Sequence, residues 1–360
     1  MLWLTALSRS PRTPLRLMLT AAAVISLISS GQPPSNAMAQ AAPPRSIAVP
    51  MPQSDRIRIA ESFRLSDAVG ESTWRGWNSA PFALLLVTDS TEYLVRHPSP
   101  SNDFTKLGYD SLLRSDVFVR PRVFSPTLLA TFPAVGGIST IVVGQARATD
   151  RSSTRWVLTV LHEHFHQLQY SRPGYAAGVR ALDLSGGDST GMWMLNYPFP
   201  YASRPVRSRF GALTRQLDRA LISASSATAG NTPATGGVGD AVSALRAALP
   251  DAAWRYLAFQ SWQEGVALYT EMRVARLAAA SSYSASAAFR ALPDYADYRT
   301  ALADLEAELH FALKKGDLAG LQRVAFYLTG AATASLLDRD QPNWRDRYFD
   351  GPFLLATPQH

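Results

Sequence analysis

The stretch "LHEHFHQLQY" (Leu161–Tyr170) contains three of the chain's six histidines within five positions. On an α-helix, residues four apart share a face, so His162 and His166 would point the same way and His164 would point elsewhere. On a β-strand, alternate residues share a face, so all three imidazoles would point the same way. The two conformations predict two different sites, and the surrounding sequence distinguishes between them.

The residues around the histidines favour the helix. The run from Trp156 to Tyr170 contains no glycine or proline and is longer than a usual strand, and Pro173-Gly174 marks its end. Four apolar residues recur at helical spacing: Leu158, Leu161, Phe165 and Leu168. We therefore predict a helix. The alternative is a metal-binding β protein with His162, His164 and His166 as ligands.

On a helix the stretch matches the pattern H-E-x-x-H, which has a specific chemistry. Neutral imidazoles of His162 and His166 can both bind one Zn²⁺, at about 2.0 to 2.1 Å. Glu163 then lies beside the metal and near its water without binding the metal itself. Burying these polar groups in a mostly apolar helix without a partner would be unfavourable. We predict His162 and His166 as ligands, and a polar contact or a packed ring for His164.

A third ligand has to come from elsewhere in the chain, because catalytic zinc sites commonly have three protein ligands and leave one position for water. The first glutamate after Glu163 is Glu264, in the apolar stretch "FQSWQEGVALYTEMRVAR". We predict Glu264 as this ligand, with an exposed helical acid as the alternative. The adjacent Gly265 is expected to let its helix approach the histidine helix closely. Glu271, two turns further, either orients a ligand histidine or pairs with an arginine.

The motif "HEHFH" followed far downstream by "WQEGVALYTE" resembles the gluzincin branch of zinc metallopeptidases, the peptidase-MA-like group. The resemblance covers two helices and implies a zincin-like fold. It implies His162, His166 and Glu264 as Zn²⁺ ligands and Glu163 as the catalytic acid/base. Thermolysin-like members carry an acid four residues after the third ligand, where this chain has Leu268. The resemblance therefore does not identify a residue that orients a ligand histidine.

Other segments are candidates for the surroundings of such a site. Tyr269 and Tyr327 are predicted to stabilise charge on a substrate carbonyl oxygen, with a core tyrosine as the alternative for each. The stretch "GISTIVVGQA" (137–146) is either a sheet edge that pairs with an extended peptide or a buried central strand. The stretch "MWMLNYPFPY" (192–201) either walls the cleft or covers the core.

The order of predicted elements indicates an α+β fold in one globular unit. Short segments rich in β-branched and aromatic residues predict a β-rich lobe at 55–150. Ala/Leu/Arg-rich periodic segments predict a helical lobe at 151–345, and residues 346–360 are predicted as a C-terminal tail. The helices expected after the histidine helix lie at 203–222, 239–249, 252–279, 296–314 and 317–338.

The first residues predict export. Three arginines, an apolar run and small residues form the pattern of a secretory signal peptide at 1–39, followed by a flexible Pro/Ala-rich linker at 40–54. The apolar run is shorter than the roughly 18 residues of a membrane span, although a retained membrane anchor is the alternative. The chain has no cysteine, so a periplasmic or extracellular protein of this sequence would be stabilised without disulfides.

The charge does not suggest a nucleic-acid partner. Formal net charge is +7, and loss of the three signal-peptide arginines leaves +4, mostly from scattered arginines. We therefore expect an exported zinc metallopeptidase that acts on a peptide or protein and has no membrane span after signal removal. The alternative is a zincin-like metal-binding or cell-envelope interaction protein without catalysis. No feature of the sequence specifies an oligomeric state or a cleavage preference.

Overall fold

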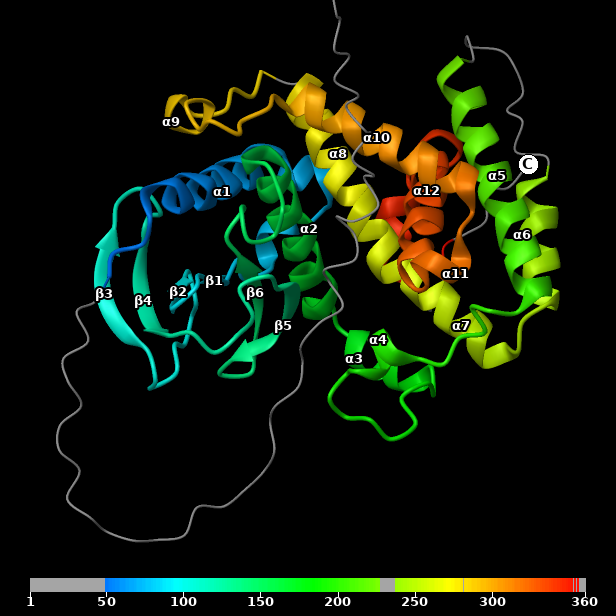
Figure 1. Cartoon of the computed structure of the whole chain (residues 1–360), viewed down its shortest axis with the longest axis horizontal. Coiled ribbons are helices and arrows are strands. Elements are labelled where there is room, and N and C mark those ends of the chain that lie inside the picture. The colour runs from blue at the N-terminus through cyan, green and yellow to red at the C-terminus, as the bar shows by residue number, and fades with distance from the viewer. Residues whose placement is uncertain (1–48, 227–236, 281, 352, 354, 356–360) are drawn as a thin grey trace, which may run out of the picture.

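A mixed six-stranded sheet and a group of helices lie side by side in the computed structural model (Figure 1). The structure describes residues 49–226, 237–280, 282–351, 353 and 355. Within these residues the chain is a mixed α+β protein, as predicted. The predicted signal peptide and most of the predicted linker lie outside the described residues. No helix in the described ranges is long and apolar enough to cross a membrane.

The strand order of the sheet makes β5 an edge strand. The strands are β1 (Leu84–Val87), β2 (Thr91–Val95), β3 (Thr105–Asp110), β4 (Ser115–Pro121), β5 (Leu129–Val135) and β6 (Ile138–Gly144). Their order is β3-β4-β2-β1-β6-β5, in which only β1 and β6 are parallel neighbours. The prediction that 137–146 forms a sheet edge is therefore wrong, and the alternative of a central strand is confirmed. Sequence patterns did not identify β5, because Pro133 interrupts it at an irregular register; an edge strand tolerates this proline.

Successive side chains of a strand point to opposite faces of the sheet, and each face has its own apolar cluster. Leu84 and Leu86 point to the main core, which includes α1 (Gln53–Thr73) and α2 (Ser153–Ser171). Leu85 and Val87 point to a smaller cluster on the opposite face. Helix α2 packs against β5 and β6 on one side and α8 on the other, so it lies between the sheet and the helical part (Figure 1). This position places the histidine stretch at the junction of the two parts.

The helical part follows the predicted segments with local differences. Its helices are α3 (Tyr175–Ala181), α4 (Trp193–Asn196), α5 (Arg204–Ser226), α6 (Val238–Ala247), α7 (Asp251–Gln260), α8 (Val266–Ala280), α9 (Ala287–Arg290), α10 (Tyr298–Lys315), α11 (Leu318–Leu321) and α12 (Val324–Asp340). The segment predicted as one helix at 252–279 is divided by a π-helical turn, Ser261–Gly265. Short 3-10 turns occur at Trp77–Ser79 and Trp344–Arg347.

Helix α1 lies where the sequence predicted the start of a β-rich lobe, which is a correction. The sequence of α1 lacks a clear apolar stripe at helical spacing, because several of the residues that it buries are polar. Asp55 accepts hydrogen bonds from Arg58 and from Gln145 at 3.0 and 2.6 Å. Glu61, with no exposed surface, accepts a hydrogen bond from Tyr283 at 2.6 Å. The contacts with Gln145 and Tyr283 join residues far apart in the chain, so a periodicity analysis cannot detect them.

The predicted C-terminal tail is also partly wrong, because its first half belongs to the core. Tyr348 and Phe353 are buried. The Tyr348 ring stacks on Trp262 with a centroid separation of 4.4 Å, and its hydroxyl donates to the Trp262 carbonyl at 2.6 Å. The segment therefore supports the π-helical turn that contains Glu264.

Candidate metal centre

Helix α2 has the predicted helical geometry, so the strand alternative for the three histidines is wrong. The Ser152 hydroxyl caps its N-terminus by accepting a hydrogen bond from the Arg155 N–H. Its apolar stripe is fully buried: Trp156, Leu158, Leu161, Phe165 and Leu168. His162 and His166 lie on one face, with ring centroids 5.1 Å apart. One face thus carries both predicted histidine ligands.

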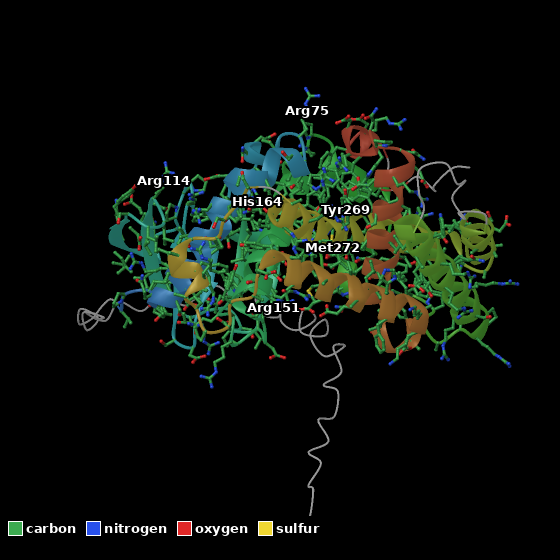
Figure 2. The ribbon with its side chains drawn as sticks, turned by 90° about the horizontal axis from the view of Figure 1, so that it is seen from above. Arg75, Arg114, Arg151, His164, Tyr269 and Met272 are labelled. Atoms are coloured by element: carbon green, nitrogen blue, oxygen red, sulfur yellow. The ribbon has the colours of Figure 1, made fainter. Side chains whose placement is uncertain are left out.

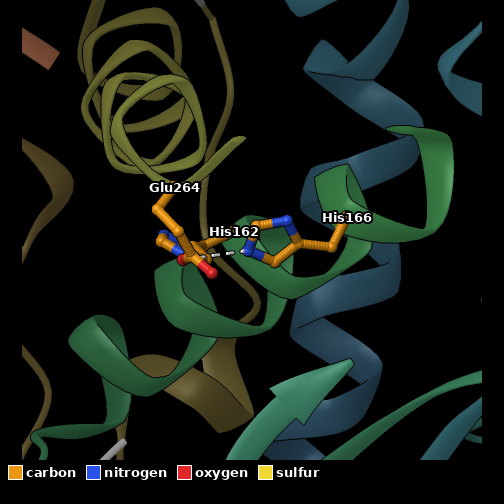
Figure 3. Close-up of side chains that lie close together, drawn as sticks. All are labelled: His162, His166 and Glu264. Carbon is orange, nitrogen blue, oxygen red and sulfur yellow. Dashed lines mark ion pairs between the residues drawn. The ribbon is translucent and has the colours of Figure 1, made fainter. Parts of the chain in front are cut away.

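Glu264 meets these two histidines (Figure 3). Its Oε2 lies 3.8 Å from His162 Nε2 and 3.4 Å from His166 Nε2. The three side chains offer ligand atoms that all lie within 4.8 Å of one another. Ligands around a tetrahedral zinc ion are about 3.3 Å apart when each bond is about 2.0 to 2.1 Å. The three donors are therefore spaced closely enough to share one cation after small side-chain adjustments.

The π-helical turn and a glycine pair position Glu264. A π turn adds one residue to a helical turn and frequently occurs at functional sites. A Cβ at Gly265 would lie 2.5 Å from the Gly330 Cα, so the turn packs backbone to backbone against α12. The expectation that Gly265 lets its helix approach the histidine helix is therefore wrong. The reason is that its bare Cα faces α12, while Glu264, one residue earlier, faces α2.

Glu271 combines both roles that the sequence left open. Its Oε2 lies 3.6 Å from His162 Nδ1, and its Oε1 lies 3.8 Å from Arg155 Nε. The carboxylate therefore contacts the ring nitrogen of His162 that faces away from Glu264. A carboxylate at this position orients a ligand histidine and raises its basicity.

Gln169 has the corresponding role for His166, and sequence reasoning missed it. Its Oε1 lies 2.7 Å from His166 Nδ1. Its amide nitrogen donates to the Gln263 carbonyl at 3.1 Å and to the Tyr348 hydroxyl at 2.8 Å. Because a carbonyl can only accept, the amide orientation is determined, and His166 Nδ1 must donate to Gln169 Oε1. The other ring nitrogen of His166, Nε2, therefore faces Glu264, and once it is deprotonated it can offer its lone pair to a metal.

The charges of the site favour a cation. Burial lowers the pKa of His162, but hydrogen bonds to Glu264 and Glu271 outweigh it and raise the pKa to about 10. Burial also lowers the pKa of His166, but the charge of Glu264 and a hydrogen bond to it outweigh burial, so the pKa of His166 is raised. Burial would raise the pKa of Glu264, but the two histidines hold it well below its usual range. Two acids thus stabilise positive charge here, and a divalent cation supplies the same charge as two protons.

Glu163 lies beside this group and lines the same cavity. The residue is buried, with 6% of its surface exposed. The hydroxyl of Thr131, on the edge strand β5, lies 2.8 Å from Glu163 Oε2 and 2.9 Å from the Glu163 carbonyl oxygen. The contact fixes the carboxylate between α2 and the sheet edge. No sequence signal singled out Thr131, because β5 itself was not predicted.

His164 is a packed ring, as the sequence suggested. It stacks on Phe82 with centroids 4.0 Å apart and contacts Trp77 edge-on. Its Nδ1 lies 2.7 Å from Gln167 Oε1. Burial lowers the pKa of His164 to about 4, so the ring is neutral at physiological pH. His164 therefore has a structural role on the far side of α2.

Only one of the two candidate tyrosines lies at the site. Tyr327 lines the cavity and accepts a hydrogen bond from Arg323. Tyr269 does not line the cavity; its hydroxyl donates to Asp338 and accepts from Arg345 at 3.0 Å. Figure 2 places Tyr269, like His164, in the interior, whereas exposed arginines extend from the surface. Tyr269 is thus a core tyrosine, and the prediction that it stabilises charge on a substrate carbonyl oxygen is corrected.

A cavity of about 680 Å³ contains the three converging donors and Glu163. One wall is the edge strand β5 and the hairpin that follows it, and α2 forms the base. The opposite wall comes from the Glu264 segment and α12. Met194 and Leu195 also line it, whereas Trp193 and Phe199 are buried in the core. The stretch 192–201 therefore both walls the cavity and covers the core.

No protein-family model matches this chain, and no characterised protein or solved structure is significantly similar to it. The chemistry of the site therefore has to be inferred from its own residues. Two imidazoles and one carboxylate form a donor set that suits zinc and related transition metals better than Mg²⁺ or Ca²⁺, which prefer oxygen ligands. The three donors lie at the wall of the cavity, so a cation bound by them would have open space beside it.

Proposed function

We propose that the protein is an exported zinc-dependent metallopeptidase of the gluzincin type with a zincin-like fold. One observation carries the proposal. His162, His166 and Glu264, from segments roughly 100 residues apart in the chain, converge in a cavity that also contains Glu163. Export rests on the signal peptide predicted at 1–39.

A zinc ion held by these side chains would supply Lewis-acid activation of a substrate carbonyl and of water. Glu163 takes the proton of the attacking water, because its carboxylate is buried next to His162 and held in the cavity by Thr131. The same carboxyl group returns this proton to the leaving amine. Glu271 and Gln169 keep the two histidine rings oriented throughout.

Tyr327 is the residue of this chain that stabilises the developing oxyanion. Burial raises the pKa of Tyr327, and the nearby Glu264 carboxylate raises it further, against the opposing effect of Arg323, so the hydroxyl is protonated and can donate. Arg323 already donates to the phenol oxygen, which makes the phenol proton a stronger hydrogen-bond donor. A donor at this position is strengthened as negative charge accumulates on the carbonyl oxygen.

We propose an extended peptide as the substrate, because an edge strand forms part of the cavity wall. Among the described residues no strand pairs with the outer side of β5, and several β5 residues line the cavity. A substrate strand can add to such an edge through main-chain hydrogen bonds, which give affinity without strong sequence preference.

The decisive experiment compares peptide cleavage with zinc content. We expect the zinc-loaded protein to cleave a proteome-derived peptide library and a chelator to stop it. Glu163→Gln should abolish turnover while about one equivalent of zinc stays bound, and the surface variant Glu306→Gln should behave like the wild type. Turnover by Glu163→Gln would disprove the acid/base role. Zinc binding without any cleavage by the wild type would instead support the non-catalytic metal-binding alternative.

A further inference from the structure

The strand β5 and the helix α2, which both line the cavity, run in the same direction. This follows from the pairing of β5 with β6 and from two hydrogen bonds between α2 and β6. β5 pairs antiparallel with β6, so that Leu129 lies opposite Val143. The Trp156 indole donates to the Gly144 carbonyl at 2.8 Å, and the Gln167 amide donates to the Ser139 carbonyl at 2.9 Å. Helix α2 is therefore antiparallel to β6 and runs in the same direction as β5.

This direction orients a bound peptide. Antiparallel pairing is slightly more stable than parallel pairing, so a substrate strand is expected to run opposite to β5. Residues on the N-terminal side of the cleaved bond would then lie near the end of α2, beside Tyr170, Tyr175 and Met194. Residues on the C-terminal side would lie near the start of α2, beside Arg151 and Arg155. The two ends differ in chemistry: the first is aromatic and apolar, and the second is charged.

The two arginines at the charged end are not equivalent. Arg155 forms ion pairs with Glu308 at 3.1 Å and with Glu271 at 3.8 Å. Arg151 donates only to neutral groups, the Thr159 hydroxyl at 2.9 Å and the Thr149 carbonyl at 3.0 Å, and forms no ion pair within the part of the chain that the structure describes. Burial lowers the pKa of Arg151 despite the field of nearby acids. A partly buried guanidinium without a direct counter-ion is unfavourable, and a ligand carboxylate would relieve this.

Arg151 also lies at a suitable distance from the metal centre. Its partner Thr159 lies three residues before His162 on the same face of α2, a rise of about 4.5 Å. An extended peptide advances about 3.3 Å per residue, so Arg151 lies roughly one or two residues from the bond next to the metal. Its neutral partners use the Nε–H and one N–H of Nη1, which leaves both N–H groups of Nη2 and the second N–H of Nη1 for a ligand.

From this arrangement we infer that Arg151 binds a carboxylate of the substrate, one or two residues to the C-terminal side of the cleaved bond. The carboxylate comes either from an Asp or Glu side chain or from the free C-terminus of a short peptide. The inference rests on the proposed peptidase function, which it extends by a substrate class. Arg151 is a specificity residue and takes no part in the bond cleavage.

The test uses pools of blocked hexapeptides that contain Glu or Gln at each position in turn. Cleaved bonds are mapped by mass spectrometry. Two sets of matched peptides then separate a side-chain carboxylate from a C-terminal one. The first set has Glu or Gln at the first or second position after the bond. The second set ends at one of those positions, with a free or an amidated C-terminus. The wild type is expected to prefer the carboxylate member of one pair by about tenfold to a hundredfold in kcat/KM, mainly through KM.

Three variants test whether the preference for a carboxylate depends on Arg151. Arg151→Met should reduce the ratio to about one, because kcat/KM falls further for the carboxylate member than for the Gln or amide member. Arg151→Lys should retain part of the ratio, because it keeps the charge but loses the planar fork. Arg147→Met, at an exposed arginine in the same loop, should leave it unchanged. If Arg151→Met does not fold, Thr159→Val removes the hydroxyl that holds Arg151 and should lower the ratio instead.

A binding measurement separates this inference from the proposed function. Calorimetric titration of zinc-loaded Glu163→Gln with the Glu and Gln pools measures recognition without turnover. Arg151-dependent binding of the Glu pool without cleavage by the wild type would support the carboxylate site and overturn the peptidase. Cleavage with no carboxylate preference, or an equal loss for both members in Arg151→Met, would overturn the inference and leave the peptidase standing. No binding preference and no cleavage would overturn both.

Discussion

Gly265 and Gly330 touch backbone to backbone, and this contact places Glu264 opposite the histidines. A Cβ at Gly330 would lie 2.2 Å from the Ser261 carbonyl oxygen, and one at Gly265 would lie 2.5 Å from the Gly330 Cα. Neither neighbour is a side chain that can rotate away. The π-helical turn that carries Glu264 is thus held from behind by α12.

We therefore expect Gly330→Ala to destabilise the fold by about 1 to 3 kcal/mol and to weaken zinc binding, because the turn must shift. Urea unfolding and a competitive chelator titration measure the two effects. Gly239→Ala in α6 is the control, since a Cβ there meets nothing within 4 Å and alanine favours a helix. Wild-type stability and zinc affinity in Gly330→Ala would contradict the assigned role.

Glu264 is expected to be required for zinc binding. Glu264→Gln removes the negative charge and the carboxylate donor, so zinc affinity should fall by at least about a hundredfold. The zinc-loaded wild type should melt at a higher temperature than the metal-free protein, and the melting temperature of Glu264→Gln should barely respond to zinc. Differential scanning calorimetry with zinc or chelator measures this. An unchanged affinity would remove Glu264 from the ligand set.

The hydrogen bond between Gln169 and His166 should influence zinc affinity from outside the ligand set. Gln169→Leu is expected to reduce affinity about tenfold to a hundredfold, because His166 Nδ1 loses the acceptor that fixes its tautomer. Gln167→Leu is a matched control: it removes the same type of contact from His164 and should lower stability without weakening zinc binding. Equal effects of both variants on zinc affinity would argue against specific orientation of His166.

The two tyrosines should separate in kinetics if the proposed function holds. Tyr327→Phe is expected to lower kcat about tenfold to a hundredfold with little change in zinc content, since it removes a donor to the oxyanion. Tyr269→Phe should keep kcat and lose stability, because its hydroxyl contacts Asp338 and Arg345 in the core. A loss of kcat in Tyr269→Phe alone would reverse the assignment.

His164 should make the metal-free protein sensitive to acid. Its folded pKa is lowered to about 4, whereas an unfolded histidine has a pKa of about 6.5, so the unfolded chain binds more protons between these values. Stability contributed by the neutral ring is therefore present above pH 6.5 and decreases as the pH falls toward 4. His162 and His166, whose pKa values are raised, are protonated in both states across this window and do not oppose the trend.

Replacement of His164 tests this directly. His164→Asn should flatten the dependence of the unfolding free energy on pH by up to about 1.4 kcal/mol per pH unit between pH 6.5 and 4. Urea unfolding in the presence of a chelator at several pH values measures the slope in both proteins. Parallel slopes in wild type and variant would show that His164 is not the titrating group.

The helix at the histidine stretch could be predicted from sequence because it depends on local geometry. The 3.6-residue period places His162 and His166 on one face and His164 on the other whatever surrounds the helix. Glu264 could be predicted as the third ligand because it is the next glutamate after Glu163 and lies in an apolar segment. Its approach to His166, at 3.4 Å, depends instead on how distant segments pack.

The remaining features were decided by tertiary structure. Helix α1 and strand β5 lack a clear pattern, since α1 buries polar residues that pair with distant partners and β5 contains Pro133. Gln169, Thr131 and Arg151 acquire their roles only through neighbours that are remote in the chain, or through the wall of a shared cavity. By itself the sequence determined which side chains share a face, because covalent geometry and helical period suffice for that. Which faces meet was decided by the packing of the whole core, since burial depends on every segment at once.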